Sequence, residues 1–209
     1  MELKTARRSG GRSRKSVRQS KKSIDQLEWG IPYNTDNFVE PLSEEGVNKV
    51  HDATMQVLEE IGIEFLNEEA KKVLSDAGCK VDRNSDNVKM DRSWVKEMIS
   101  KAPSEFEIFP RNINRSVKIG GRNMAFVNVS SPPNVMDLDR GRRVGDFESF
   151  KDLIKLTQYF NCIHLAGGYP VEPVDIHASV RHLDCLYEKL TLTDKVCHAY
   201  SLGSQRVED

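Results

Sequence analysis

The sequence predicts an α/β protein whose carboxyl-terminal part is the beginning of a β/α barrel of the TIM type. Strand-like segments at residues 125–129, 162–166 and 196–202 alternate with amphipathic helices, and they begin about 35 residues apart, the size of one βα unit. Parallel strands joined by helices need a sheet that is covered on its outer face, so they indicate a barrel or a doubly wound sheet. Three strands cannot close a barrel, and the chain reaches Asp209 before its third βα unit is complete. We therefore expect a truncated barrel.

A helical module is predicted for residues 42–104, ahead of the barrel part. Ser43, Asn67 and Asp91 each precede an apolar pattern of helical period, and such side chains accept hydrogen bonds from the first free N–H groups of a helix. Pro103 ends the third helix because it cannot continue one. The module is expected to contain these three helices.

A β-hairpin is predicted for residues 105–123. Polar and apolar residues alternate with a period of two at 105–109 and again at 116–119, and the spacer between them is rich in turn-forming residues.

The predicted barrel part, residues 124–209, contains two helices. Asp146 is expected to cap the first and Asp175 the second, and residues 130–143 are expected to form a long loop. The second helix is expected to turn one apolar face toward the sheet, formed by Ile176, Val180, Leu183, Tyr187 and Leu190. Arg181, His182 and Asp184 on the same helix are expected to be solvated or to pack against neighbouring helices.

The composition predicts a water-soluble protein with a basic amino terminus. Hydrophobic residues make up 38% and charged residues 30%, and no apolar run is long enough for a membrane-spanning helix. The net charge is -1, but residues 1–22 hold nine Lys or Arg against the single acid Glu2, so the remainder is acidic. Residues 1–41 are expected to form a disordered tail and linker. Nucleic acid is not an expected partner, although a basic arm that binds a polyanion is the non-enzymatic alternative.

The four cysteines form no C-x-x-C pair, and no signal peptide precedes them, so reduced thiols in the cytoplasm are expected.

Candidate functional residues follow the predicted strands, because barrel enzymes carry their functional groups on the loops after the carboxyl ends of the strands. Ser131 follows the first strand, Tyr169 the second, and Tyr200 lies near the end of the third. Their position makes them candidates for substrate binding. Catalytic residues are not identified.

A zinc site is the second enzymatic alternative. It would combine Cys162 and His164 with Cys197 or His198, but the last two point to opposite faces of a strand and cannot both join one site. No metal site is therefore expected.

Several separated motifs resemble the trimethylamine:corrinoid methyltransferase family, in particular the amino-terminal portion of its bacterial members. The motifs are LSEEG at 42–46, LEEIGI at 58–63, VEPVD at 171–175, RHLD at 181–184, TDK at 193–195 and AYSLG at 199–203. The resemblance covers the chain from about Leu42 to its last residue.

This resemblance implies a β/α barrel that transfers a methyl group from a tertiary or quaternary amine, such as trimethylamine or glycine betaine, to a corrinoid protein. The corrinoid (cobalamin) would be carried by that partner, with no cofactor bound directly by this chain and with homo-oligomers as a further expected partner. Trimethylamine enzymes of methanogenesis use a pyrrolysine to bind the amine, whereas many bacterial relatives lack it. That position would lie beyond Asp209, so the fragment alone is expected to be inactive. Tyr169 and Tyr200 could contact the substrate cation through their aromatic faces.

Overall fold

The computed structural model describes residues 24–82, 84–198, 200 and 202–209. Of the predicted disordered tail and linker, residues 1–41, the first 23 residues lie outside the described residues. The helices are α1 (Glu44–Gln56), α2 (Glu68–Asp76), α3 (Arg92–Ser100), α4 (Phe147–Tyr159), α5 (Arg181–Leu192) and α6 (Ser204–Glu208), with a π-helical turn η1 (Val57–Ile61) and a 3-10 turn η2 (Ile113–Arg115). The strands are β1 (Ile63–Glu64), β2 (Lys80–Val81), β3 (Asn87–Lys89), β4 (Glu105–Ile108), β5 (Val117–Gly120), β6 (Asn134–Asp137), β7 (Gly141–Val144), β8 (Leu165–Ala166) and β9 (Val196–Cys197).

The helical module contains the three predicted helices, and each predicted cap is confirmed. Ser43 accepts a hydrogen bond from the main chain at the start of α1, Asn67 does so for α2, and Asp91 for α3. The module also contains an antiparallel sheet in the order β1-β3-β2, which the sequence analysis missed. Val88 in the central strand β3 is fully buried, so this small sheet shares the core of the module.

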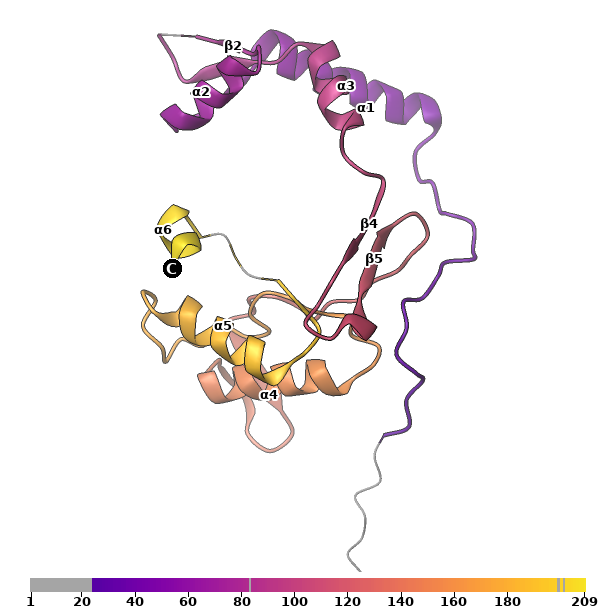
Figure 1. The fold of residues 1–209 in the computed structure, drawn as a ribbon, viewed down its shortest axis with the longest axis vertical. Coiled ribbons are helices and arrows are strands. Elements are labelled where there is room, and N and C mark those ends of the chain that lie inside the picture. The colour runs from indigo at the N-terminus through magenta and orange to yellow at the C-terminus, as the bar shows by residue number, and fades with distance from the viewer. Residues whose placement is uncertain (1–23, 83, 199, 201) are drawn as a thin grey trace, which may run out of the picture.

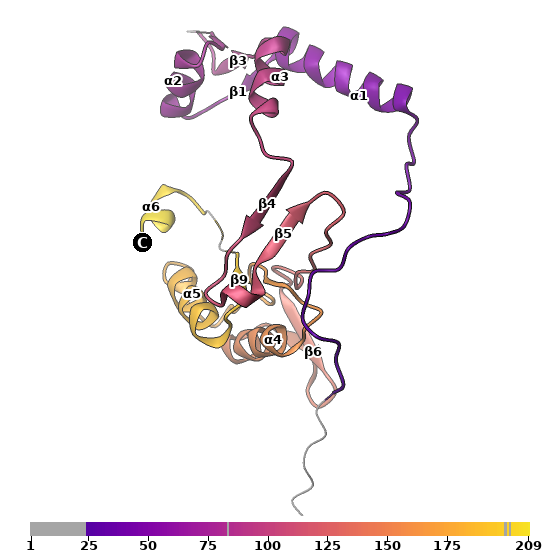
Figure 2. The same ribbon diagram turned by 45° about the vertical axis from the view of Figure 1, so that its right-hand side comes forward.

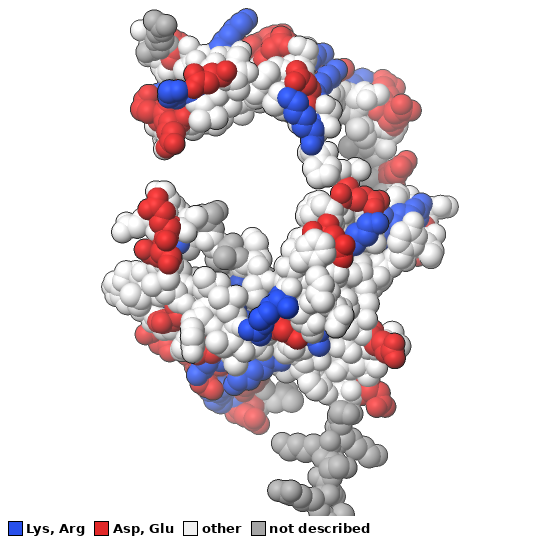
Figure 3. All heavy atoms as spheres, in the orientation of Figure 1, with Lys and Arg blue, Asp and Glu red and all other residues white. Residues whose placement is uncertain are grey.

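The helical module lies apart from α4 and α5, and β4 leads from one part to the other (Figures 1 and 2). The predicted hairpin is confirmed, because β4 and β5 pair antiparallel with Phe106 opposite Ile119. Figure 3 shows an open hollow between the helical module and α6, with acidic and basic side chains interspersed over this face.

A second hairpin, β6–β7, spans Asn134–Val144 and so occupies most of residues 130–143, which were predicted to form a loop. Gly141 opens β7 with φ of +64°, a left-handed conformation that glycine adopts without steric cost. The prediction of an irregular loop was wrong here, because two strands of four residues give little alternation to detect.

Three short segments lie side by side in parallel. β8 pairs with β9 through Leu165 opposite Val196, and Val127 forms a parallel bridge with Leu165. The predicted strand at 125–129 is therefore reduced to a single bridge, and the two later strands have only two residues each. Two residues of the predicted third strand, at positions 199 and 201, lie outside the described part of the chain.

Helices α4 and α5 pack around one core. Phe150 and Ile154 of α4 contact Cys185 of α5 together with Tyr169 and Val171, and Phe150, Ile154 and Cys185 are fully buried. The Asp146 cap of α4 is confirmed, since its carboxylate accepts from the main-chain N–H of Ser149.

The start and the orientation of α5, which was predicted as the second helix of a barrel, differ from the prediction. Helix α5 begins at Arg181, whereas the Asp175 carboxylate accepts hydrogen bonds from the N–H of Phe147, at the start of α4. The face predicted to point inward is exposed, with Val180, Leu183, Tyr187 and Leu190 between 42% and 67% accessible. The buried positions are Cys185 and Lys189, because the stripe that contains Cys185 packs against α4.

Candidate functional site

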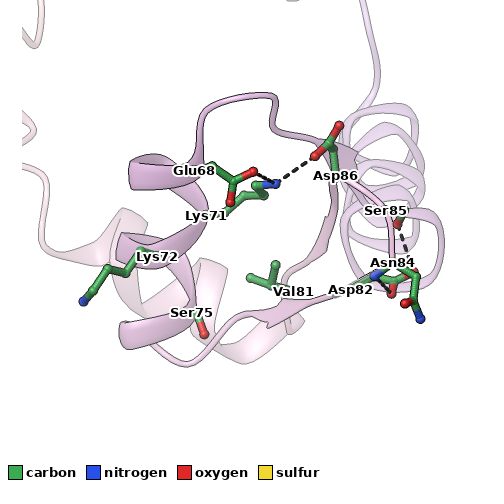
Figure 4. A pocket seen from close by; sticks show the side chains of 9 residues that line it. All are labelled: Glu68, Lys71, Lys72, Ser75, Val81, Asp82, Asn84, Ser85 and Asp86. Atoms are coloured by element: carbon green, nitrogen blue, oxygen red, sulfur yellow. Dashed lines mark hydrogen bonds and ion pairs between the residues drawn. The ribbon is translucent and has the colours of Figure 1, made fainter.

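One pocket lies in the helical module, between α2 and the turn that joins β2 and β3 (Figure 4). Its volume is about 600 Å³. Lys71 points into it, but its ammonium group is paired with the carboxylates of Glu68 at 2.6 Å and Asp86 at 2.8 Å. Asp82 accepts bonds from the N–H of Asn84 and the hydroxyl of Ser85, which closes the turn. Lys71 and Asp82 are thus each held by neighbouring groups of the pocket.

The three residues predicted from strand ends lie together in the other part of the molecule. The rings of Tyr169 and Tyr200 meet edge to face with their centroids 5.2 Å apart. The hydroxyl oxygens of Ser131 and Tyr200 are 2.6 Å apart, and the N–H of Ser131 donates to the carbonyl of Tyr169 at 2.6 Å. Ser131 adopts a φ of 59°, uncommon for a residue with a side chain, which marks a constrained loop. The loop after Val127 is thus tied to the loops after β8 and β9.

Gly168 permits this close arrangement. A Cβ atom at position 168 would lie 2.0 Å from the hydroxyl oxygen of Tyr200 and 2.1 Å from its ring carbon Cζ. The phenol of Tyr200 therefore rests directly on the main chain of Gly168, a position that only glycine fits without a shift of the ring.

The two tyrosines differ in their environment. Tyr169 is 8% exposed, and burial raises its pKa to about 12. Burial also acts to raise the pKa of Tyr200, but hydrogen bonds from neighbouring groups, among them the Ser131 hydroxyl, outweigh it and lower the pKa below the ordinary value. Tyr200 is half-buried, so it is the accessible phenol of the pair.

Basic side chains surround the tyrosines. Lys189 is 2% exposed, and its ammonium group donates to the carbonyls of Gly168, at 3.3 Å, and His198. Burial lowers its pKa. Sequence reasoning missed Lys189, although its spacing of four from Cys185 places both on one helical face. His182, which was expected to be solvated or to pack against helices, lines a small pocket with Lys189 and both tyrosines.

The residues of the zinc alternative do not come together. His164 is buried, its Nδ1 accepts from the N–H of Phe126 at 2.9 Å, and its Nε2 lies 3.0 Å from the carbonyl of Gly30, to which it donates. Both ring nitrogens are therefore used by the main chain. Cys162 is exposed. Over residues 24–82, 84–198, 200 and 202–209, no three His, Cys, Asp or Glu side chains are grouped so that they could hold a metal ion.

Within the described part of the chain, no helix has the length and apolar composition needed to cross a membrane.

The fold and the site define a protein of helices and small sheets whose candidate functional groups converge beyond the carboxyl ends of short parallel strands, a position at which enzymes with parallel sheets bind their substrates. Residues 7–209 match the model of the trimethylamine methyltransferase (MTTB) family, so the chain belongs to this family. The resemblance found in the sequence motifs is thereby confirmed.

Two bacterial relatives illustrate the similarity. A glycine betaine methyltransferase of Desulfitobacterium hafniense (strain Y51) is 38% identical over 168 residues, which cover 80% of this chain and 35% of the relative. A trimethylamine methyltransferase MttB of Desulfitobacterium hafniense (strain DSM 10664 / DCB-2) is 28% identical over 142 residues, covering 66% of this chain and 28% of the relative.

An archaeal relative matches over a shorter stretch. The trimethylamine methyltransferase MttB of Methanosarcina barkeri (strain Fusaro / DSM 804) is 33% identical over 75 residues, covering 35% of this chain and 15% of the relative. The chain spans about a third, or less, of the length of the curated relatives that it matches.

Proposed function

We propose that this chain is part of an enzyme that transfers a methyl group from a tertiary or quaternary amine to a corrinoid protein. Membership of the trimethylamine methyltransferase family supports the proposal, as does the similarity to a glycine betaine methyltransferase and to a trimethylamine methyltransferase. The observation that carries it is the convergence of Ser131, Tyr169 and Tyr200 at the carboxyl ends of neighbouring parallel strands. The corrinoid would be held by the partner protein and would supply the methyl-accepting cobalt, while this chain orients the amine.

We further propose that residues 124–209 form the first part of a β/α barrel. The parallel pairing of β8 with β9 and of Val127 with Leu165 supports this, because successive strands of a barrel pair in chain order. By this proposal the remaining strands would be needed for a complete site, and the chain alone would be inactive.

The four cysteines are free thiols, which supports a cytoplasmic location as part of the same proposal. A homo-oligomer stays a prediction.

Tyr200 is the residue through which the proposal is tested. Its ring offers an aromatic face to a quaternary ammonium group, and its hydroxyl is positioned by Ser131. Tyr200→Phe keeps the face and loses the hydroxyl, whereas Tyr200→Ala loses both. We expect amine affinity to fall by about tenfold in the alanine variant and by less in the phenylalanine variant.

The experiment uses the full-length product of the native gene together with the purified corrinoid protein, because the proposal itself expects residues 1–209 alone to be inactive. Methylation of cobalt is followed by absorbance, with trimethylamine and glycine betaine as donors. Tyr187→Ala is the matched control, because Tyr187 is 67% exposed on α5 and makes no contact with the site. If neither amine supports methylation of cobalt, or if Tyr200→Ala behaves like the control, the proposal fails.

No observation on the described residues favours the zinc alternative, and the basic arm of the non-enzymatic alternative lies outside them.

A further inference from the structure

A small pocket beside the two tyrosines is lined almost entirely by basic and phenolic groups. Its volume is about 50 Å³. It lies between α5, α6 and the segments that follow β8 and β9, and its lining residues, all of them described, include no acid. They are Tyr169, His182, Leu186, Lys189, Tyr200 and Arg206.

Lys189 provides a buried positive charge at this pocket. Its ammonium group contacts two main-chain carbonyls and forms no ion pair with any carboxylate of the described residues. Dipoles of carbonyl groups compensate a buried ammonium group only in part, whereas buried charges in proteins are usually paired. Among the described residues, Lys189 is therefore a buried basic group without a carboxylate partner.

Two further basic side chains at this pocket have N–H groups that are not used in hydrogen bonds to other described side chains. His182 has a side chain that is 13% exposed, and its Nε2 lies 3.1 Å from the carboxylate of Asp209. Its other nitrogen, Nδ1, is buried without a hydrogen-bond partner. Arg206 forms no ion pair or hydrogen bond with another side chain that the structure describes. By contrast, Arg181 on the same helix as His182 is paired with Glu172 and with a main-chain carbonyl.

The positive charge of the basic side chains that line this pocket does not suit an ammonium group. Lys189 and Arg206 line a space of about 50 Å³, and their positive charge repels a cation and attracts an anion. The planar fork of an arginine matches the two oxygens of a carboxylate, and hydrogen bonds between charged groups are the stronger ones in proteins. A carboxylate is also small enough for the pocket. The phenol hydroxyl groups of Tyr169 and Tyr200 can donate to the same oxygens.

We propose that the pocket lined by His182, Lys189 and Arg206 is a carboxylate subsite that binds the anionic end of a zwitterionic quaternary amine. The ammonium end then lies on the accessible side of Tyr200, outside the pocket. This inference rests on the proposed function for its substrate, and it assigns specificity to residues of α5 and α6. The pocket does not increase the affinity for an amine that has no carboxylate.

Three probes separate the two ends of such a substrate. Glycine betaine has both charges, tetramethylammonium has only the cation, and acetate has only the carboxylate. Calorimetric titration of the protein produced from its native gene measures the affinity for each. We expect acetate to compete with glycine betaine for the wild-type protein.

Arg206→Gln removes one charge from the pocket, and Lys189→Met removes the buried one. Each substitution is expected to lower the affinity for glycine betaine and for acetate by about tenfold, as for the loss of one charge-assisted hydrogen bond. The affinity for tetramethylammonium is expected to stay unchanged. Arg142→Gln is the matched control, since Arg142 is exposed on β7 and is not among the lining residues. Circular dichroism shows whether Lys189→Met folds, and Arg206→Gln carries the test if it does not.

Unchanged affinity for glycine betaine in Arg206→Gln overturns the carboxylate subsite, even if acetate binding is lost. The two proposals can fail separately. If Arg206→Gln weakens glycine betaine and acetate but no amine methylates the corrinoid protein, the subsite stands and the proposed function fails. If methyl transfer occurs and Arg206→Gln does not alter its dependence on the concentration of glycine betaine, the proposed function stands and the carboxylate subsite fails.

Discussion

Replacing Gly168 by alanine tests whether the strand-end residues are as closely packed as the structure shows. The new Cβ would lie 2.0 Å from the hydroxyl oxygen of Tyr200, a separation at which something must shift. The ring would have to move by more than about 1 Å to reach ordinary contact, which breaks its 2.6 Å bond to Ser131. Overpacking costs about 1–3 kcal/mol and the lost hydrogen bond about 1 kcal/mol. We therefore expect Gly168→Ala to lower the free energy of unfolding by about 2–4 kcal/mol.

Urea unfolding measures this loss as a lower midpoint with an unchanged dependence on urea concentration. Gly30→Ala is the control, because no atom lies within 4 Å of the added Cβ, and we expect it to cause no loss. The double variant Gly168→Ala/Tyr200→Ala removes the overlap, so its loss should be smaller than the sum of the two single losses. Strict additivity, or a Gly168→Ala variant as stable as wild type, would refute the close contact.

Three further outcomes are expected. Lys195→Met removes the ammonium group that three main-chain carbonyls bind at 2.6–2.7 Å. The carbonyl of Phe160 still accepts from the N–H of Ile163, whereas those of Thr157 and Ile163 lose this partner, so urea unfolding should show a loss of about 2 kcal/mol or more. A loss under about 1 kcal/mol would contradict this capping role. Burial raises the pKa values of Cys185 and Tyr169 to about 12, from ordinary values of 9.0 and 10.0. Both groups lose their proton at lower pH in the unfolded state than in the folded state. The free energy of unfolding is therefore retained below pH 9 and falls from there toward pH 12, by up to about 1.4 kcal/mol per pH unit for each group. Cys185→Ala should make this fall less steep, and an equally steep fall in the variant would contradict the raised pKa of Cys185. At pH 8, iodoacetamide should modify exposed Cys162 well before buried Cys185, as mass spectrometry of the folded protein can show; equal rates would contradict the buried position.

Local signals predicted the helix starts because their physics is local. Ser43, Asn67, Asp91 and Asp146 each bond to an N–H group two or three positions further along the chain, so the pattern is visible in the sequence. Asp175 has the same kind of side chain, but its carboxylate bonds to the start of a different helix, at Phe147. That contact depends on tertiary packing, which no local pattern contains.

The candidate site was predictable in part for a similar reason. Tyr169 and Tyr200 follow strands, and strand ends can be inferred from periodicity. Lys189 was missed because its burial depends on which face of α5 turns toward α4, and the more apolar face with Leu183 and Tyr187 turned out to be the exposed one. A search for a basic residue in register with Cys185 would have identified it.

The contact between His164 and Gly30 has a practical consequence for expression of shortened proteins. Residue 42 begins the predicted helical module, which makes it one choice for the start of a shortened protein. Yet the ring of Trp29 lies edge-on against His164 with centroids 5.8 Å apart, and Gln26 bonds to the main chain of Tyr159 and Asn161. A protein that starts at residue 42 would lack these contacts to His164, Tyr159 and Asn161, and we expect it to be insoluble. A shortened protein should therefore keep Ile24 and all residues after it.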